Sequence, residues 1–424
     1  MIGNNNIIQT DESFGADGFP GPHQMKRLGA LIDHAYHQCT PMREKMDRAG
    51  IMPEHIRKYE DLIKIPITSK EEHLELQKKY PPSGGLLTIP LNRLHRIGIH
   101  PGPIYDWHTP TAYQACLKFV KSTGFGKEDI VAVTMDYHLM GAGAVFDQTL
   151  TDLEATVIPV GPGNKEIIVR ALKELGVTGY VGTASFLHAV LNLAEDSGFQ
   201  VQKDFSLRLA LLGAEPVPPS LRQRFEEHYG IETRQGYGTS EVSVVAWECS
   251  EKSGMHFSVD AIIEIVDPET GIQLGPESEG EIVVTPLDMD RPLIRFGTGD
   301  IGSFTMAPCP CGNLFPRLVG ISGRLGEAYK IRGRFLHLRE VEAFFHEFQE
   351  IQTYQIVLER MDHKDSLCLK LIPTPSGFSR SDLDDVIKKR FKDTLGIRPD
   401  QVKWLNKRLQ SREYSEILDL RKWE

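Results

Sequence analysis

The middle of the chain alternates short apolar runs with stretches of helical periodicity. From about Asp129, the runs DIVAVTM, ATVIPVG, VTGYVGT and LRLALLGAE each predict a strand. Helices are predicted between them: one from Lys165 to Leu175, one in SFLHAVLNLAEDSG, and one in PPSLRQRFEEHYG, which has Pro at its start and Gly just past its end. Strands that alternate with helices in this way predict a parallel, doubly wound α/β layer.

The pattern changes on both sides of this layer. Residues from about His23 to Gly50 show helical spacing, and KIPITSKEEH offers Thr68 or Ser69 as the N-cap of a further helix. After about Gly254, AIIEIVDPETG and EGEIVVTPL predict two antiparallel strands joined by a turn rich in Pro and Gly.

The end of the chain predicts a separate unit. After GRLGEAYKIRGR, helices are predicted in LREVEAFFHEF and SDLDDVIKKRFKDTL, and strands in TYQIVLER and SLCLKLIP. The fold class is therefore α/β, with a large N-terminal domain of doubly wound mixed or parallel sheets plus β elements, and a small C-terminal α+β domain. We place the large domain at 1–322 with a loose tail over 1–20, a hinge at 323–330, and the small mobile domain at 331–424.

Charge and composition narrow the possible functions. The chain has 424 residues, with 48 Lys and Arg against 58 Asp and Glu, so its net charge is 48 − 58 = −10. An acidic chain without basic runs argues against nucleic acid and anionic membranes as main partners. No apolar run approaches membrane-spanning length, and the first residues lack a signal pattern, so we expect a cytoplasmic protein.

The segment GYGTSE carries residue types suited to a nucleotide. Gly236 and Gly238 would let backbone N–H groups approach a phosphate, and Thr239 adds a hydroxyl. Tyr237 has a face for stacking on a base, and Glu241 is an oxygen ligand of the kind Mg²⁺ needs. Taken alone, the sequence GYGTSE is equally typical of a polar, glycine-rich turn.

Two later segments add to this reading. In FGTGDIG, Asp300 could accept both hydroxyls of a ribose, although a two-residue hairpin turn explains the glycines equally well. In SGRLGEAYKIRGR, Arg324, Lys330 and Arg332 could meet phosphates, or the segment is a solvated linker.

Three cysteines and a histidine predict a metal site. Cys249 and His256 lie seven residues apart, and Cys309 and Cys311 form CPCG, whose tight turn uses Gly312. Three thiolates and an imidazole match tetrahedral Zn²⁺, and a site with four protein ligands is structural rather than catalytic. The alternative is three unrelated thiols and a surface histidine. A disulfide framework is not expected, because disulfides are rare in cytosolic proteins.

Together, GAEP, GYGTSEV, FGTGDIG and GRxxxxxKIRG, followed by a final domain of roughly 100 residues, resemble the adenylate-forming superfamily, and most closely its phenylacetate–CoA ligase branch. The segments YHLMGAGAVFD and TASFLHAVL match the glycine-rich acyl-pocket segments of that branch. The resemblance implies that a carboxylate and ATP form an acyl-adenylate and pyrophosphate, after which the acyl group passes to coenzyme A. It also implies a homodimer and a rotation of the small domain between the two steps.

The resemblance assigns roles to matching positions. Thr239 would contact the α-phosphate, Glu241 would ligate Mg²⁺, and Arg324 would assist Asp300 at the ribose. The nucleotide-binding set is Gly213, Ala214, Glu215, Gly236, Tyr237, Gly238, Thr239, Asp300 and Arg324. The acyl substrate would be bordered by Tyr137, Gly141, Gly143 and Phe186.

The phosphate loop departs from the family pattern. The family has a loop close to SSGTTGKP, whereas IHPGPIYDWHT stands here and keeps Gly102 alone. Two prolines remove backbone donors, so His100 or Thr109 would have to compensate. The remaining histidines are expected to be structural or solvated, among them His95, His108, His138 and His188.

The C-terminal motif departs as well. The position of the family's late catalytic lysine is occupied by Glu413, with Lys407, Arg408 and Arg412 as candidate substitutes, and Gly326 stands at the hinge position. Losing phosphate-contacting cations weakens adenylation, because the developing charge needs electrostatic stabilisation.

Two function classes follow. The first is an ATP-dependent acyl-CoA ligase for an aromatic or similar small carboxylate, using ATP, Mg²⁺, coenzyme A and a structural Zn²⁺. The second is a homologue that binds AMP or an acyl-adenylate without full ligase activity, as a sensor or partner subunit, and a third possibility is an adenylate-forming enzyme with an acceptor other than coenzyme A.

Overall fold

The computed structural model describes residues 20–100, 104–268, 270–325, 328–332, 334–361, 364–374, 380–405 and 417–421. Packing divides the chain into two units. The first holds residues up to 217 and 223–323, and the second holds 324–424 together with the short segment 218–222. The division after Gly323 falls within the segment that the sequence analysis proposes as a hinge.

The first unit begins with two helices where the sequence pattern suggested one helical stretch. Helix α1 spans Pro22–Gln38 and α2 spans Thr40–Arg48. Between them Cys39 is extended, and Pro41 in the first turn of α2 cannot donate the backbone bond that a continuous helix requires. Helix α3 spans Lys70–Lys79 and is capped by Ser69, whose Oγ accepts from the backbone N–H of Glu72 at 3.1 Å.

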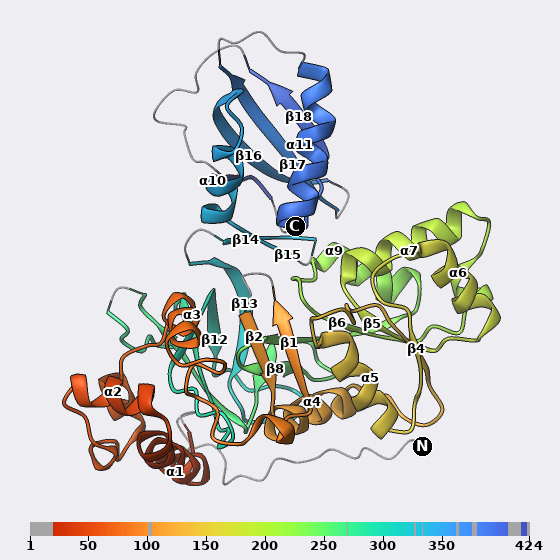
Figure 1. Ribbon diagram of the computed structural model, residues 1–424. Coiled ribbons are helices and arrows are strands. Elements are labelled where there is room, and N and C mark those ends of the chain that lie inside the picture. The colour runs from red at the N-terminus through yellow and green to blue at the C-terminus, as the bar shows by residue number, and fades with distance from the viewer. Residues whose placement is uncertain are drawn as a thin grey trace. The chain divides into compact units, whose positions relative to one another are not determined.

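The predicted parallel layer is confirmed. Its strands run in the order β4-β3-β5-β6-β7 and pair in parallel. Their bounds are β3 Ile130–Val133, β4 Thr156–Pro159, β5 Gly179–Gly182, β6 Leu209–Leu212 and β7 Glu232–Thr239. Figure 1 shows α4 and α5 on one side of these strands and α6 and α7 on the other. The helices are α4 Pro110–Thr123, α5 Ala142–Asp152, α6 Lys165–Glu174, α7 Ala184–Asp196, α8 Val201–Asp204 and α9 Pro219–Gln223, the last continuing as a π-helical turn over Arg224–His228.

The same sheet continues beyond β7 with antiparallel strands. Its full order is β10-β11-β12-β13-β9-β8-β7-β6-β5-β3-β4, which makes eleven strands. The added strands are β8 Ser243–Glu248, β9 Met255–Phe257, β10 Ala261–Val266, β11 Gly280–Pro286, β12 Phe296–Thr305 and β13 Arg317–Arg324. The predicted antiparallel pair β10–β11 is confirmed. One large core joins α1 and α2 to these strands, with Leu28, Ile265 and Phe296 fully buried in it.

A separate hairpin, drawn in orange in Figure 1, belongs to the first unit. Strand β1 spans Arg96–His100 and β2 spans Ile104–His108, and they pair antiparallel. The side-chain amide of Gln77 on α3 makes two hydrogen bonds to the backbone of Tyr105, one donated at 2.9 Å and one accepted at 3.1 Å. The amide of Ile99 donates to the carbonyl of Leu139 at 2.7 Å, so the hairpin is fixed on two sides.

The second unit has the predicted small α+β architecture. Its four-stranded sheet has the order β18-β17-β16-β19, and a two-stranded sheet pairs β14 with β15. The elements are β14 Ala328–Ile331, β15 Arg334–His337, α10 Leu338–His346, β16 Ile351–Met361, β17 Lys364–Pro373, α11 Arg380–Leu395, β18 Gln401–Trp404 and β19 Ile417–Asp419. Phe344 and Phe391 meet edge to face in its core, with ring centroids 5.1 Å apart. None of the described helices is long and apolar enough to cross a bilayer.

Candidate active site

Strand β7 carries the GYGT segment at the junction of the two halves of the large sheet. Residues 232–235 pair in parallel with β6, and residues 236–239 pair antiparallel with β8. GYGT is therefore the end of a strand, not the glycine-rich turn that the letters allow. Only glycine fits at position 238, because the Cβ of any other residue would lie 2.1 Å from the carbonyl oxygen of Ser243.

The phenol of Tyr237 joins β7 to β12. Its hydroxyl lies 3.0 Å from Asp300 Oδ2 and 3.1 Å from Thr298 Oγ1, and all three side chains are buried. Thr298 Oγ1 also accepts from the backbone N–H of Asp300 at 3.1 Å. Asp300 therefore lies within a ten-residue strand, and the alternative of a two-residue hairpin turn in FGTGDIG is wrong.

The acidic residue Glu241 follows directly after β7. Thr239 donates a 2.7 Å hydrogen bond from its hydroxyl to Glu241 Oε2. Burial alone would raise the pKa of Glu241, but the charge of Lys70 and the bond from Thr239 bring this pKa below its ordinary value. Arg291 donates to the backbone carbonyl of Glu241. A carboxylate that is ionised at neutral pH is suited to bind a divalent cation.

The GAEP segment follows β6, at the carboxyl end of the parallel layer. Ala214 takes a positive φ of 67°, and Gly213 donates its backbone N–H to Gly182 at 3.1 Å. Glu215 accepts from the backbone N–H of Ser185 at 2.6 Å and from its hydroxyl at 3.1 Å. This carboxylate therefore ties the end of β6 to the first turn of α7.

The residues proposed to border the acyl substrate come from two elements. Tyr137, Gly141 and Gly143 lie between β3 and the start of α5, and the Tyr137 hydroxyl donates to Asp147 at 3.0 Å. Phe186 lies in the first turn of α7 and is half-buried. Gly143 donates its backbone N–H to Asp136 at 2.9 Å, which closes the turn before α5.

Four candidate metal ligands come together, as the sequence analysis predicts. The ligand atoms of Cys249, His256, Cys309 and Cys311 all lie within 4.8 Å of one another, and no other such group of three or more ligands occurs in the described part of the chain. The Cys249 and Cys309 sulfurs are 3.7 Å apart, and Cys311 Sγ is 3.4 Å from His256 Nε2. Ligand atoms at the corners of a tetrahedron around zinc would be about 3.8 Å apart, given Zn–S bonds of about 2.3 Å.

The surroundings of this cluster also suit a metal. His256 Nδ1 lies 3.2 Å from the carbonyl oxygen of Phe315, which orients the ring and leaves Nε2 to face the sulfurs. Gly312 has a φ of 82° and closes the CPCG turn through a 3.0 Å bond to Cys309. The cluster connects the β8–β9 loop with the β12–β13 loop, both within the first unit.

Several predicted site residues belong to the second unit or lie outside the described residues. Arg324 is the last residue of β13 and the first of the second unit. Arg332 bonds to Asp400 and to the carbonyl of Asp365, so its guanidinium is used within the second unit. Outside the described residues lie Gly102, Gly326, Lys407, Arg408, Arg412 and Glu413.

Residues that the sequence analysis did not select also belong to this region. Thr298 lies two residues before Asp300, and strand alternation places both on one face of β12, which was a usable signal. Lys70 and Arg291 act on Glu241 from α3 and from the β11–β12 connection, and no local sequence pattern announces either of them.

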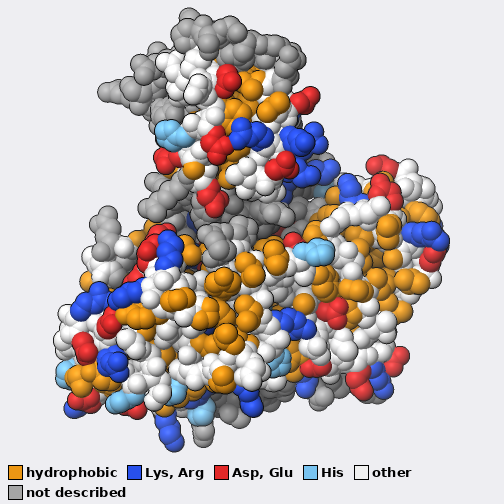
Figure 2. Space-filling view, in the orientation of Figure 1, with side chains coloured by type: hydrophobic (Ala, Val, Ile, Leu, Met, Phe, Trp, Pro, Cys, Tyr) orange, Lys and Arg blue, Asp and Glu red, His pale blue; other side chains and the backbone are white. Residues whose placement is uncertain are grey.

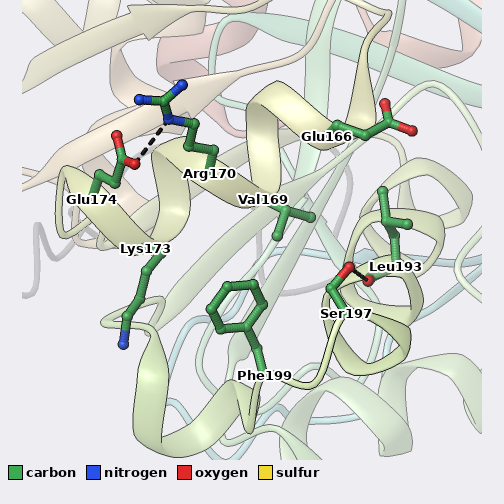
Figure 3. Close-up of a pocket in the computed structure, with 8 residues that line it drawn as sticks. All are labelled: Glu166, Val169, Arg170, Lys173, Glu174, Leu193, Ser197 and Phe199. Carbon is green, nitrogen blue, oxygen red and sulfur yellow. Dashed lines mark hydrogen bonds and ion pairs between the residues drawn. The ribbon is translucent and has the colours of Figure 1, made fainter.

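A surface pocket of about 240 Å³ lies between α6 and α7 (Figure 3). Val169 and Phe199 form its apolar part, and an ion pair between Arg170 and Glu174, 2.8 Å long, lies at its edge. No residue of the candidate active site lines this pocket, so we assign it no part in the chemistry.

Comparison with known proteins finds related enzymes. Residues 108–286 match the model of the AMP-binding enzyme family. The phenylacetate-coenzyme A ligase of Pseudomonas putida is 30% identical over 366 residues, covering 81% of this chain and 80% of its own length. The enzyme of the same name from Escherichia coli K12 is 28% identical and covers 89% of each chain.

A solved structure supports the fold. The structure of 2-hydroxyisobutyryl-CoA ligase in complex with 2-HIB-AMP and CoA superposes with a TM-score of 0.87, at 22% identity, over 97% of this chain and 92% of that one. From the sequence relationship, the chain belongs to the phenylacetate–coenzyme A ligase branch of the adenylate-forming, AMP-binding ligases.

Proposed function

We propose that this acyl-CoA ligase activates a small aromatic carboxylate through an acyl-adenylate and then transfers the acyl group to coenzyme A. The observation that carries the proposal is the relationship to the P. putida phenylacetate-coenzyme A ligase, combined with the buried Tyr237–Thr298–Asp300 network. Family membership does not favour a homologue that binds an adenylate without making it.

The aromatic preference rests on the pocket residues. Tyr137 and Phe186 are half-buried and offer apolar ring surfaces. Gly143 lets the backbone pack closely against the Tyr137 ring, since a Cβ there would lie 2.8 Å from Tyr137 Cδ2. Aromatic side chains contribute large contact areas at ligand sites. An aliphatic acid of similar size is the competing substrate class.

A pyrophosphate-release screen tests this function. Aromatic and aliphatic acids are each supplied with ATP and Mg²⁺, with and without coenzyme A. We expect release with at least one aromatic acid and formation of its CoA thioester. Release without thioester would indicate another acceptor, and silence across a broad panel would reject the proposal.

We further propose that Glu241 holds Mg²⁺ on the nucleotide phosphates, with the hydroxyl of Thr239 beside it. The fit rests on the ionised carboxylate and its 2.7 Å bond from Thr239. Bound Mg²⁺ would neutralise phosphate charge. Asp300 and Tyr237 would hold the ribose and the base, and rotation of the second unit would separate the two half-reactions.

The four-ligand cluster is proposed to hold a structural Zn²⁺ through Cys249, His256, Cys309 and Cys311. Four protein ligands leave no open coordination position, so the ion would fix two loops and take no part in the reaction. Elemental analysis of purified protein should give about one zinc per chain. A value near zero would reject the site.

The expected homodimer and cytoplasmic location remain predictions. Figure 2 shows apolar side chains gathered on one face of the first unit, and exposed apolar residues of that unit include Ile97 at 45% and Leu139 at 69%. Exposed apolar surface of this kind is typical of an interaction site. Light scattering on the purified protein would measure the oligomeric state.

A further inference from the structure

A buried arginine lies beside the four-ligand cluster. Arg317, the first residue of β13, is 4% exposed. It stands opposite His256 of β9 in the antiparallel pairing of these two strands. Residues opposite each other on neighbouring strands project from the same face of a sheet. Arg317 is therefore a neighbour of the proposed metal ligands, although the sequence analysis did not select it.

The guanidinium of Arg317 contacts both loops that supply the ligands. Its Nη1 donates to the carbonyl oxygen and to the hydroxyl of Ser253, in the β8–β9 loop. Its Nη2 donates to the carbonyl oxygen of Ala307 at 2.8 Å, in the β12–β13 loop that also carries Cys309. Gly254 lets the first loop come close, because a Cβ there would lie 3.1 Å from the Cβ of Arg317. The side chain thus spans the same two loops as the four ligands.

The positive charge of Arg317 has no carboxylate partner among the described residues. Its two Nη atoms bind neutral oxygen atoms, and its Nε has no hydrogen-bond partner in the described part of the chain. A buried charge is costly unless it is paired. The three cysteines of the cluster lie beside this arginine, and a cysteine becomes negative when it binds a metal as the thiolate. The cluster can therefore supply the counter-charge that Arg317 needs.

The charge of a zinc-loaded cluster matches this need. Cysteine binds zinc as the thiolate and histidine binds it as the neutral imidazole. Three thiolates outweigh the two positive charges of Zn²⁺ by one unit, so the loaded cluster is negative. Because Cys309 and His256 are buried, this negative charge also needs a partner. The guanidinium of Arg317 offsets it, and the cluster and the arginine are together neutral.

A hydrogen-bond chain links the guanidinium to one of the cysteines. Ser253 Oγ accepts from Arg317 and lies 3.7 Å from Cys309 Sγ. A metal-bound thiolate carries no proton, so Ser253 is the donor in this contact once a metal is bound. The backbone N–H of Asn313 donates to Cys311 Sγ at 3.4 Å. Hydrogen bonds to the charged form of a group favour that form, and such outer partners orient and tune metal ligands.

We propose that Arg317 is the counter-ion of the metal centre and acts on Cys309 through Ser253. The inference rests on the proposed zinc site and adds to it two residues that bind no metal themselves. Both are positioning residues, because they act through the cysteines. The competing explanation is mechanical: Arg317 only fastens the two loops to each other. The two explanations differ in whether the effect of Arg317 depends on the metal.

The first experiment measures how fast the zinc-loaded full chain loses its metal to an excess of a chromogenic chelator. Arg317→Met keeps an extended side chain but removes the charge, and we expect zinc release to be about tenfold faster or more, as for the loss of other outer partners of metal ligands. The matched control is Arg208→Met, since Arg208 pairs with Asp129 and lies outside the cluster. It should leave the release rate unchanged.

The second experiment separates the charge of Arg317 from its contacts to the loops. Melting temperatures are measured for zinc-loaded and for chelator-stripped protein. If Arg317 only fastened the loops, Arg317→Met would lower both temperatures by the same amount. If it is the counter-ion, Arg317→Met should at least halve the rise in melting temperature that zinc produces. Arg317→Lys keeps the charge and should keep most of that rise.

The variant Ser253→Ala tests the hydrogen-bond chain without removing the arginine. The protein is stripped and reloaded with Co²⁺, whose thiolate complexes have a charge-transfer absorption band. We expect this band to move to longer wavelength in Ser253→Ala, because Cys309 loses a hydrogen-bond donor. A change in loop contacts alone would not move the band. Ser250→Ala, an exposed serine of the same loop, is the control, and Ser253→Ala keeps the inference testable if Arg317→Met does not fold.

The outcomes distinguish this inference from the proposals on which it rests. A zinc content near zero in the unaltered chain rejects the metal site and this inference with it. One zinc per chain, with unchanged release in Arg317→Met and an unmoved band in Ser253→Ala, overturns this inference alone. The ligase function is decided by the acid panel, whatever the zinc measurements give.

Discussion

The hydroxyl of Tyr237 links β7 and β12, the two strands of the proposed nucleotide site. Tyr237→Phe keeps the ring but removes the hydrogen bonds to Asp300 and Thr298. We expect a loss of about 1 kcal/mol in the free energy of unfolding, together with weaker AMP binding, because Asp300 loses its orienting partner. Chemical denaturation and AMP titration measure both. Unchanged AMP affinity would contradict the assignment of Asp300 to the nucleotide.

Glu241 carries the proposed Mg²⁺ site, and its substitution gives a sharp test. Glu241→Gln is nearly isosteric but removes the charge that a hard cation needs. Pyrophosphate release should fall by at least a hundredfold, while AMP binding without Mg²⁺ should change little. Retained activity at saturating Mg²⁺ would place the ion on other ligands.

The buried His73 makes stability depend on acidity. Burial lowers the pKa of His73 from 6.5 to about 4, with Arg291 acting in the same direction and Glu241 and Asp106 opposing it. As pH falls below 6.5 the unfolded chain takes up a proton that the folded chain refuses until about pH 4, so stability is lost across this window. The loss is at most about 3 kcal/mol. In the variant His73→Gln, the denaturation midpoint should depend less on pH between pH 6.5 and 4. An unchanged pH dependence of the midpoint would argue against His73 as the cause.

The grouping of candidate residues was predictable where it followed a local pattern. Thr239, Glu241 and the four metal-ligand candidates lie in short motifs, so their residue types and spacing revealed them. Arg291 and His73 are distant in sequence and meet Glu241 and Asp106 only through folding. Nothing in their neighbourhoods signals that they will be buried.

Among the elements, α3 connects the β1–β2 hairpin to the rest of the first unit. Its cap Ser69 receives the backbone N–H of Glu72, and its other end holds the hairpin through Gln77. Ser69→Ala should cost about 1 kcal/mol of stability. Thermal melting measures this cost, and Ser83→Ala is a control outside the helix. No loss would show that the first turn is held by other contacts.

Whether a segment is a helix or a strand could be predicted from its hydrophobic periodicity. The residues at which each strand begins and ends depend on its pairing with neighbouring strands in the folded structure. The apolar runs of the parallel layer are correctly read as strands. Strands β3, β5 and β6 are buried almost throughout, whereas β4 lies at the sheet edge and is partly exposed. The glycines of GYGT and FGTGD suggested turns, yet both segments are strands, since glycine there allows close approach of neighbouring backbone and side chains. The helical stretch near the start is divided at Cys39, and Pro41 two residues later was a usable sequence signal for this break.

For the whole molecule, the two units have separate cores and should respond separately to damage. Phe391 is fully buried in the core of the second unit. Phe391→Ala should cost about 3–5 kcal/mol in that unit and leave AMP binding by the first unit within twofold. Calorimetric melting should then show an early transition that AMP does not shift. A single transition that AMP shifts as a whole would mean that the units unfold together.

Strand β7 joins the parallel and antiparallel halves of the large sheet. Its first half pairs in parallel with β6, and its second half pairs antiparallel with β8. The residues proposed to border the acyl group come from the parallel side. Of those proposed to hold the nucleotide, Tyr237, Thr239 and Asp300 lie at or beyond the junction, whereas Gly213, Ala214 and Glu215 follow β6 in the parallel layer. Selection or engineering for a new acid can therefore alter the loops after β3 and β5 without moving the strand that carries Tyr237. On the proposed assignments, changes in these loops would alter the acid that is activated and leave the nucleotide-binding strand in place.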